Sequence, residues 1–133
     1  MGAAELHALA DRLRGLDQVS GEIARDALAG VQAAARETAA AGTAPDGTSW
    51  KPKKDGTGRP LANAPAAIAA VVSGTTKAVV TLIIKGRYVF HNFGTKRDPK
   101  RQILPDAKTG VPAKIADAIR AATRRVLARE VKP

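Results

Sequence analysis

The first forty residues constrain the fold most, because one helical pattern extends over almost a third of the chain. Apolar residues recur there at spacings of three and four, which places them on one face of a helix. This stripe comprises Leu6, Leu9, Leu13, Leu16, Val19, Ile23, Ala27 and Val31. Gly15 and the Ser20-Gly21 pair weaken the middle of the pattern. Residues 1–41 are therefore predicted to form a helical arm, either as one helix or as a pair of helices.

The core that such a chain can build is thin. Hydrophobic residues make up 44% of its 133 residues, and alanine supplies much of that fraction. Three of its four aromatic residues stand together between Tyr88 and Phe93. A chain of this length is expected to form a single domain, residues 1–133. A core of small side chains is marginal alone, and assembly can complete it.

Residues 42–65 form a basic loop rich in glycine and proline, and it contains Trp50, the only tryptophan. A tryptophan in a polar loop most often folds back over the edge of the core, and this interpretation is favoured. The alternative is an exposed interface residue, because tryptophan provides a large contact area at a low entropic cost.

Residues 66–106 are predicted to form the β-sheet region. Ala78–Ile84 is rich in β-branched residues and apolar on both faces, as expected of a central, covered strand. Ile68–Val72 can pair with it as a hairpin across the loop Ser73–Lys77. The start of this first strand is ambiguous, because Asn63 and Pro65 equally suit the first turn of a short helix.

A further strand is predicted over Arg87–Phe93, ending at Gly94. Alternation then places Tyr88, Phe90 and Asn92 on one face, and Val89, His91 and Phe93 on the other. Residues 111–131 are predicted to form the C-terminal helix, since Pro112 suits a first turn and Ile115, Ile119, Ala122 and Val126 form an apolar stripe. The expected fold is α+β: an N-terminal helix or helix pair, an antiparallel sheet of three to four strands, and a C-terminal helix.

The net charge of +10 is unevenly distributed. Residues 1–49 hold 4 basic and 7 acidic side chains, residues 50–110 hold 12 and 3, and residues 111–133 hold 6 and 2. The basic middle favours acidic partners, either nucleic acid or an acidic protein surface. Two loops are the candidate docking elements. Their basic residues are Lys51, Lys53, Lys54, Lys96, Arg97 and Lys100.

Composition also bears on the compartment. The absence of cysteine excludes disulfides and thiolate zinc sites and suits a reducing cytosol. No apolar run reaches the roughly 18 residues that a transmembrane helix needs, and the N-terminus has no signal-peptide pattern. An intracellular protein, or one released by lysis, is expected.

Motifs for catalysis are not found. His91-Asn92 invites comparison with a His-Asn-His nuclease, but the only other histidine is His7, in the N-terminal helical segment. The acidic residues form no pair at glycosidase or two-metal spacing, and no phosphate-binding glycine loop is present. No catalytic, cofactor-binding or metal-binding residue is therefore expected. A small RNase-like site built on His91 with Arg97 or Arg101 is a minor alternative.

A basic nucleic-acid-binding module is the stronger alternative. The two basic loops could neutralise phosphates, and Trp50, Tyr88 and Phe93 could provide stacking faces. No helix-turn-helix, RNP, KH or zinc-finger signature accompanies them.

The order of motifs along the chain resembles a known family. Ala44-Pro-Asp-Gly-Thr-Ser-Trp50-Lys-Pro52 is followed by Tyr88-Val-Phe-His-Asn-Phe-Gly94 and by Pro99-Lys-Arg-Gln-Ile-Leu-Pro105. This set is similar to the phage virion-morphogenesis and tail-completion proteins of tailed phages and Mu-like prophages. The resemblance covers about residues 44–106, and the flanking helices match in type alone. Departures are Asn92 for the usual Gln, Ile103 for the usual Phe, and Asn63–Ile68 in place of a frequent Thr-Gly-x-Leu turn.

The resemblance implies a structural, non-catalytic virion protein at the head–tail junction or tail end, assembled in the cytoplasm of the bacterial host. Such a protein would form a homo-oligomeric ring that docks on other neck or tail proteins, namely the connector, stopper, tail tube or tail terminator. It would need no cofactor and no membrane, and its DNA contact would be weak and non-specific. The predicted contact surface comprises Trp50, Tyr88, His91, Phe93, Gly94, Thr95, Arg101 and Leu104.

Overall fold

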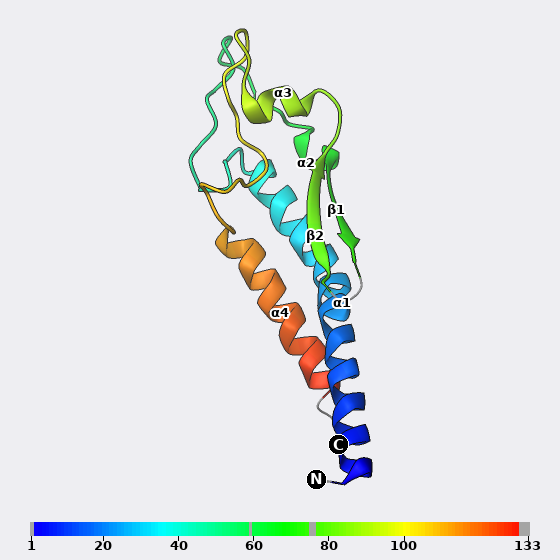
Figure 1. The fold of residues 1–133 in the computed structure, drawn as a ribbon. Coiled ribbons are helices and arrows are strands. Elements are labelled where there is room, and N and C mark those ends of the chain that lie inside the picture. The colour runs from blue at the N-terminus through cyan, green and yellow to red at the C-terminus, as the bar shows by residue number, and fades with distance from the viewer. Residues whose placement is uncertain (1, 59, 75–76, 131–133) are drawn as a thin grey trace.

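The structure is a computed structural model that describes residues 2–58, 60–74 and 77–130, apart from the side chains of residues 12–14, 16 and 17. Its elements are α1 (Ala3–Ala40), α2 (Ala64–Ala67), β1 (Ile68–Ser73), β2 (Val79–Ile84), α3 (Tyr88–Phe93) and α4 (Ala113–Glu130). They confirm the predicted α+β class. Figure 1 shows an elongated molecule in which α1 and α4 lie side by side, the β1–β2 hairpin covers part of α1, and α3 with two long loops forms one end. This end, residues 42–63 and 86–112, is called the loop end below.

α1 is one uninterrupted helix of 38 residues, so the alternative of a helix pair is wrong. Each interior glycine costs roughly 1 kcal/mol relative to alanine, and packing of the C-terminal half offsets that cost. Ala27 and Val31 of the predicted stripe are buried there, whereas Leu6 and Leu9 are exposed. The side chains of Leu13 and Leu16 lie outside the described part. The helix ends at Ala40, and Gly42, directly after the C-cap Ala41, has a φ of +73° that suits the residue following a helix C-terminus.

α4 packs antiparallel along α1. Arg125 Nε lies 2.9 Å from Asp26 Oδ2, and Lys114 Nζ lies 3.1 Å from Glu37 Oε1. Gly30 permits this close approach, because a Cβ at that position would lie 3.2 Å from the Cβ of Ala118. Ile115, Ala122 and Val126 are buried as the stripe predicts, and Ile119 is partly exposed. In Figure 1 the N-terminal turns of α1 extend beyond the end of α4.

The hairpin is confirmed, with Ile68 paired to Ile84 and Ser73 to Val79. Within the described residues it is the whole sheet, so the predicted three to four strands reduce to two. The alternative of a short helix before the first strand is also confirmed, as α2. Arg36 Nε donates to Ile68 O and Gln32 Oε1 accepts from Ala70 N, so side chains of α1 cover the outer edge of β1.

The predicted third strand is wrong, because residues 88–93 form helix α3. The periodicity of a short, largely aromatic segment such as Tyr88–Phe93 does not distinguish a strand from a helical turn. In the helix Tyr88 and Asn92, four residues apart, turn toward the protein, and Phe90 and Phe93 turn outward. Gly94 has φ +78° and ψ 158° and ends the helix in a conformation that is essentially restricted to glycine.

β2 is not the central, covered strand that its sequence predicts. Its residues alternate between half-buried and exposed, and the side chains of Val79 and Ile83 are 54% and 40% exposed. The inner face packs on the helices, but no described element covers the outer face. The strand is apolar on both faces, but the described residues of this chain bury the inner face alone.

Two small clusters form the core. One joins Trp50, Ile68 and Ile103 beneath the loop end, and the other joins Val31 and Ile115 between α1 and α4. Most of the other buried apolar residues are alanines, in agreement with the expectation of a thin core.

Candidate interaction surface at the loop end

Trp50 anchors the loop of residues 42–63 to the core. Its side chain is 7% exposed, its Nε1 donates to Gln102 O at 2.8 Å, and its backbone N–H donates to Gly42 O. The favoured prediction, a tryptophan folded over the core edge, is confirmed. Trp50 is therefore not part of the exposed surface of this chain.

Arg101 connects three segments that are distant in sequence. Its Nε donates to Lys51 O at 2.8 Å and its Nη2 to Pro52 O at 3.0 Å. Its backbone N–H donates to His91 O at 2.8 Å. The loop of Trp50, helix α3 and the segment Pro99–Pro105 are thereby fixed to one another. The three motifs of the sequence resemblance form one folded unit.

Asn92 completes this unit, and sequence reasoning missed it as a functional position. It is 5% exposed, and its Oδ1 accepts the backbone N–H groups of Ile103 at 2.8 Å and Leu104 at 2.9 Å. The available signal was an amide side chain in the middle of an aromatic run, because such a group needs buried partners.

The loop after α3 is a tight turn. Thr95 Oγ1 accepts from the backbone N–H groups of Arg97 and Asp98, and Thr95 N donates to Asp98 O at 3.0 Å. Gly94 touches the returning chain, since a Cβ there would lie 3.1 Å from the Cβ of Lys100. Thr95 is thus exposed as predicted and also organises the turn.

The other predicted contact residues divide between the inside and the surface. Tyr88 and Leu104 are half-buried and pack on the core cluster of Trp50. Phe93, expected on a core strand, is 73% exposed because α3 directs it outward. Phe90, which the prediction omitted, is also exposed.

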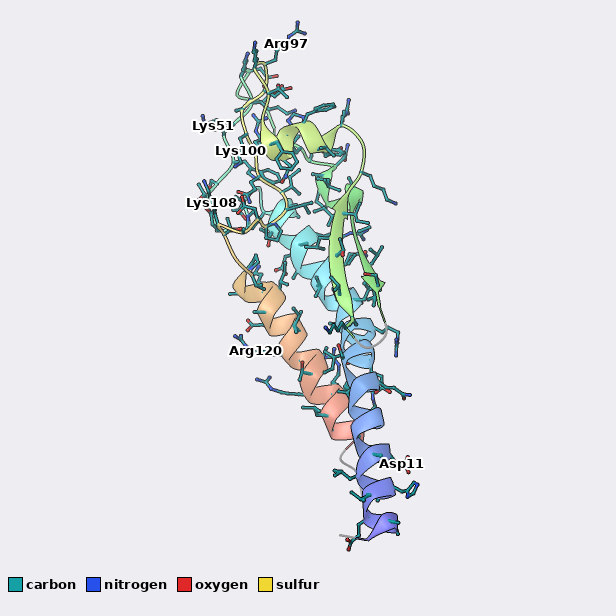
Figure 2. All side chains as sticks on the ribbon, in the orientation of Figure 1. Asp11, Lys51, Arg97, Lys100, Lys108 and Arg120 are labelled. Carbon is teal, nitrogen blue, oxygen red and sulfur yellow. The ribbon has the colours of Figure 1, made fainter. Side chains whose placement is uncertain are left out.

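The six predicted basic side chains are all exposed, on two loops at the end of the molecule farthest from the N-terminus. In Figure 2 Arg97 lies at the tip, and Lys51, Lys100 and Lys108 follow along the same side. Lys108 was not predicted. Between the two loops lies a hollow of about 460 Å³ whose lining includes Lys53, Lys54, His91, Arg97, Asp98 and Arg101.

Three aspartates shape the loops. Each carboxylate accepts a backbone N–H from a threonine two or three residues later, and this bond lowers the pKa of the aspartate. The pairs are Asp46 with Thr48, Asp55 with Thr57 and Asp106 with Thr109. These carboxylates stay ionised at neutral pH, and they stabilise local turns in the loops that carry the basic residues.

His91 is half-buried, and its Nδ1 is buried without a hydrogen-bond partner in the described structure. Among residues 2–58, 60–74 and 77–130, no group of three or more His, Cys, Asp or Glu side chains is placed to hold a metal ion. No helix in that part of the chain is long and apolar enough to cross a membrane. Comparisons of the chain with protein-family models, curated proteins and solved structures found no match.

Proposed function

We propose that this protein is a structural, non-catalytic component of a phage virion that acts in tail completion or head–tail joining. One observation carries the proposal. The segments 44–52, 88–94 and 99–105, which carry the family resemblance, hold one another through the bonds of Trp50, Asn92 and Arg101. Residues of the motifs therefore maintain a defined surface, as a docking role requires.

The loop end docks on a neighbouring virion protein. Its described lysines and Arg97 are exposed, and the backbone of the loops that carry them is fixed by the buried Arg101, so the positions of these loops are defined before a partner binds. Preorganised charges steer association with an acidic surface and fix its register. The partner is a connector, stopper, tail tube or tail terminator protein.

The hairpin serves self-assembly into a ring. Val80, Leu82 and Ile84 direct their backbone groups away from β1, and no hydrogen bond within the described residues reaches them. The outer face adds the exposed Val71, Val79 and Ile83. An open, apolar strand edge favours pairing with another chain, and a second copy of this protein is the proposed occupant.

Removal of the gene from the phage or prophage that encodes it tests the function. Electron micrographs should then show separate heads and tails or unfinished tail ends, and the wild-type gene supplied in trans should restore complete particles. Complete, infectious particles formed without the protein would refute the proposal.

The basic nucleic-acid-binding module remains the second candidate, because the loop end concentrates positive charge. For a docking protein, binding to duplex DNA should be weak and should collapse as salt rises, since only phosphate neutralisation supports it. Tight, sequence-selective binding at physiological salt would favour the module instead. The purified protein should cleave neither DNA nor RNA, and cleavage that depends on His91 would favour the RNase-like alternative.

A further inference from the structure

The hollow between the two loops is strongly cationic. Lys53 and Lys54 line it from one side, and Arg97 and Arg101 from the other, with Asp98 as the one carboxylate among its described lining residues. No ion pair within 4 Å joins any of these four cations to a carboxylate in the described structure. Like charges gathered in a concave site raise the local affinity for an anion.

Arg101 makes this site more than a group of surface lysines. It is 7% exposed, and both of its side-chain bonds go to neutral backbone carbonyls, so its charge is buried without a counter-ion. A buried charge of this kind is costly unless it is paired. Its Nη1 has no protein partner among the described residues. Arg101 lines the hollow, and its Nη1 is not among the fully enclosed, unpartnered side-chain atoms of the described residues.

The shape and lining of the hollow favour a carboxylate over nucleic acid. Its described lining residues include no Phe, Tyr or Trp on which a base could stack, and the exposed Phe93 lines a different depression. DNA binding also depends on many phosphate contacts spread along the duplex. A recess between two protruding loops instead admits a single projecting side chain.

We propose that this hollow binds carboxylate side chains on an acidic segment of a protein partner. The site would pair one carboxylate with the free Nη1 of Arg101 and with the ammonium groups of Lys53 and Lys54. This inference rests on the proposed function, since docking in the virion supplies such a partner.

Fluorescence anisotropy with a labelled hexaglutamate peptide tests the site. The hollow variant Lys53→Gln/Lys54→Gln/Arg97→Gln is compared with Lys51→Gln/Lys96→Gln/Lys100→Gln, which removes three charges from the same loops outside the hollow. The hollow variant should lose at least about tenfold more affinity than this matched control, because close charge pairs contribute far more than general attraction. Equal losses in the two variants would overturn the site.

A second arm uses a 20-base-pair DNA duplex as the probe. The two variants should weaken duplex binding equally, since only overall charge supports it. If only the hollow variant lost duplex binding, the hollow would bind phosphate and the carboxylate assignment would fall. Arg101 stays unchanged in both variants because it holds the loop carbonyls, and thermal melts establish that both variants are folded.

The outcomes separate this inference from the proposed function. If the hollow binds the peptide selectively but complete particles form without the protein, the carboxylate site is supported and the proposed virion function is refuted. If heads and tails fail to join without the protein but the two variants lose equal peptide affinity, the proposed function is supported and the carboxylate site is refuted.

Discussion

At the scale of single residues, one amide determines the course of the chain after α3. Asn92 Oδ1 accepts two backbone N–H groups, those of Ile103 and Leu104, in a largely buried environment. Asn92→Ala should lower the free energy of unfolding by about 2–4 kcal/mol, because both donors lose their acceptor. Denaturant unfolding measures this loss. Asn92→Asp keeps an acceptor oxygen, so its free energy of unfolding should fall clearly less. Equal decreases in the two variants would show that these hydrogen bonds are not the cause.

The aromatic residues Trp50 and Phe93 should differ in their contribution to stability, because Trp50 is buried and Phe93 is exposed. Trp50→Ala removes a buried ring and a hydrogen bond to Gln102, and should cost about 3–5 kcal/mol. Phe93→Ala removes a ring that is 73% exposed, and should cost less than about 0.5 kcal/mol. Thermal melts of the two variants check this. A large loss for Phe93→Ala would mean that the outward orientation of α3 is wrong.

Several residue positions could be predicted from the sequence, for local reasons. A lone tryptophan in a polar loop indicates a buried anchor, and Gly94 after an apolar run indicates a conformation that side chains disfavour. The roles of Asn92 and Arg101 could not be predicted in this way. Their partners lie about 11 and 50 residues away in the chain, and local patterns carry no information on such pairs.

At the scale of elements, α3 and the hairpin illustrate the same limit. β1 and β2 were predicted correctly because β-branched runs and the intervening turn are local signals. Residues 88–93 are wrongly predicted as a strand because a segment of six residues is compatible both with strand alternation and with a helical turn. The helix allows Tyr88 to face the core and Asn92 to face the returning chain. This choice depends on tertiary contacts, which local sequence patterns do not encode.

The pairing of α1 with α4 contains a pH-sensitive contact. A hydrogen bond with the Glu22 side chain, reinforced by charge repulsion, raises the pKa of Glu130 above its ordinary value of 4.5. The folded chain therefore binds a proton more readily than the unfolded chain. This contact contributes stability at pH values below the ordinary pKa, and the contribution is lost as the pH rises through the raised value.

Glu130→Gln should accordingly raise the melting temperature at pH 7, where the two carboxylates repel each other. The difference from the wild type should shrink as the pH falls below the raised pKa of Glu130, because Glu130 is then protonated and no longer carries the repelling charge. Melts monitored by circular dichroism across this range measure it. Glu37→Gln is the control, since Glu37 pairs with Lys114 and its loss should not be stabilising. A higher melting temperature for both variants would contradict the assignment.

At the scale of the whole molecule, the sequence predicts more sheet than the described residues form. Apolar residues on both faces of Val79–Ile84 predict a covered strand, but such a pattern does not specify which chain supplies the cover. Here the inner face packs on α1 and α4, and no described element covers the outer face or pairs with the free edge of β2. The prediction of three to four strands is wrong for the single chain. Under the proposed function, a second copy of the chain would supply the missing cover.

Self-association through the hairpin is the prediction that follows. Val79→Lys/Ile83→Lys places charges on exposed positions, so the chain should stay folded while pairing with a second copy is weakened. Sedimentation velocity should show oligomers for the wild type and mainly monomers for this variant. Leu6→Lys/Leu9→Lys is the matched control, because it charges two equally exposed apolar positions on the projecting turns of α1. Oligomers that survive in the hairpin variant but dissociate in this control would place the contact on α1, and the open edge of β2 would then not be the assembly surface.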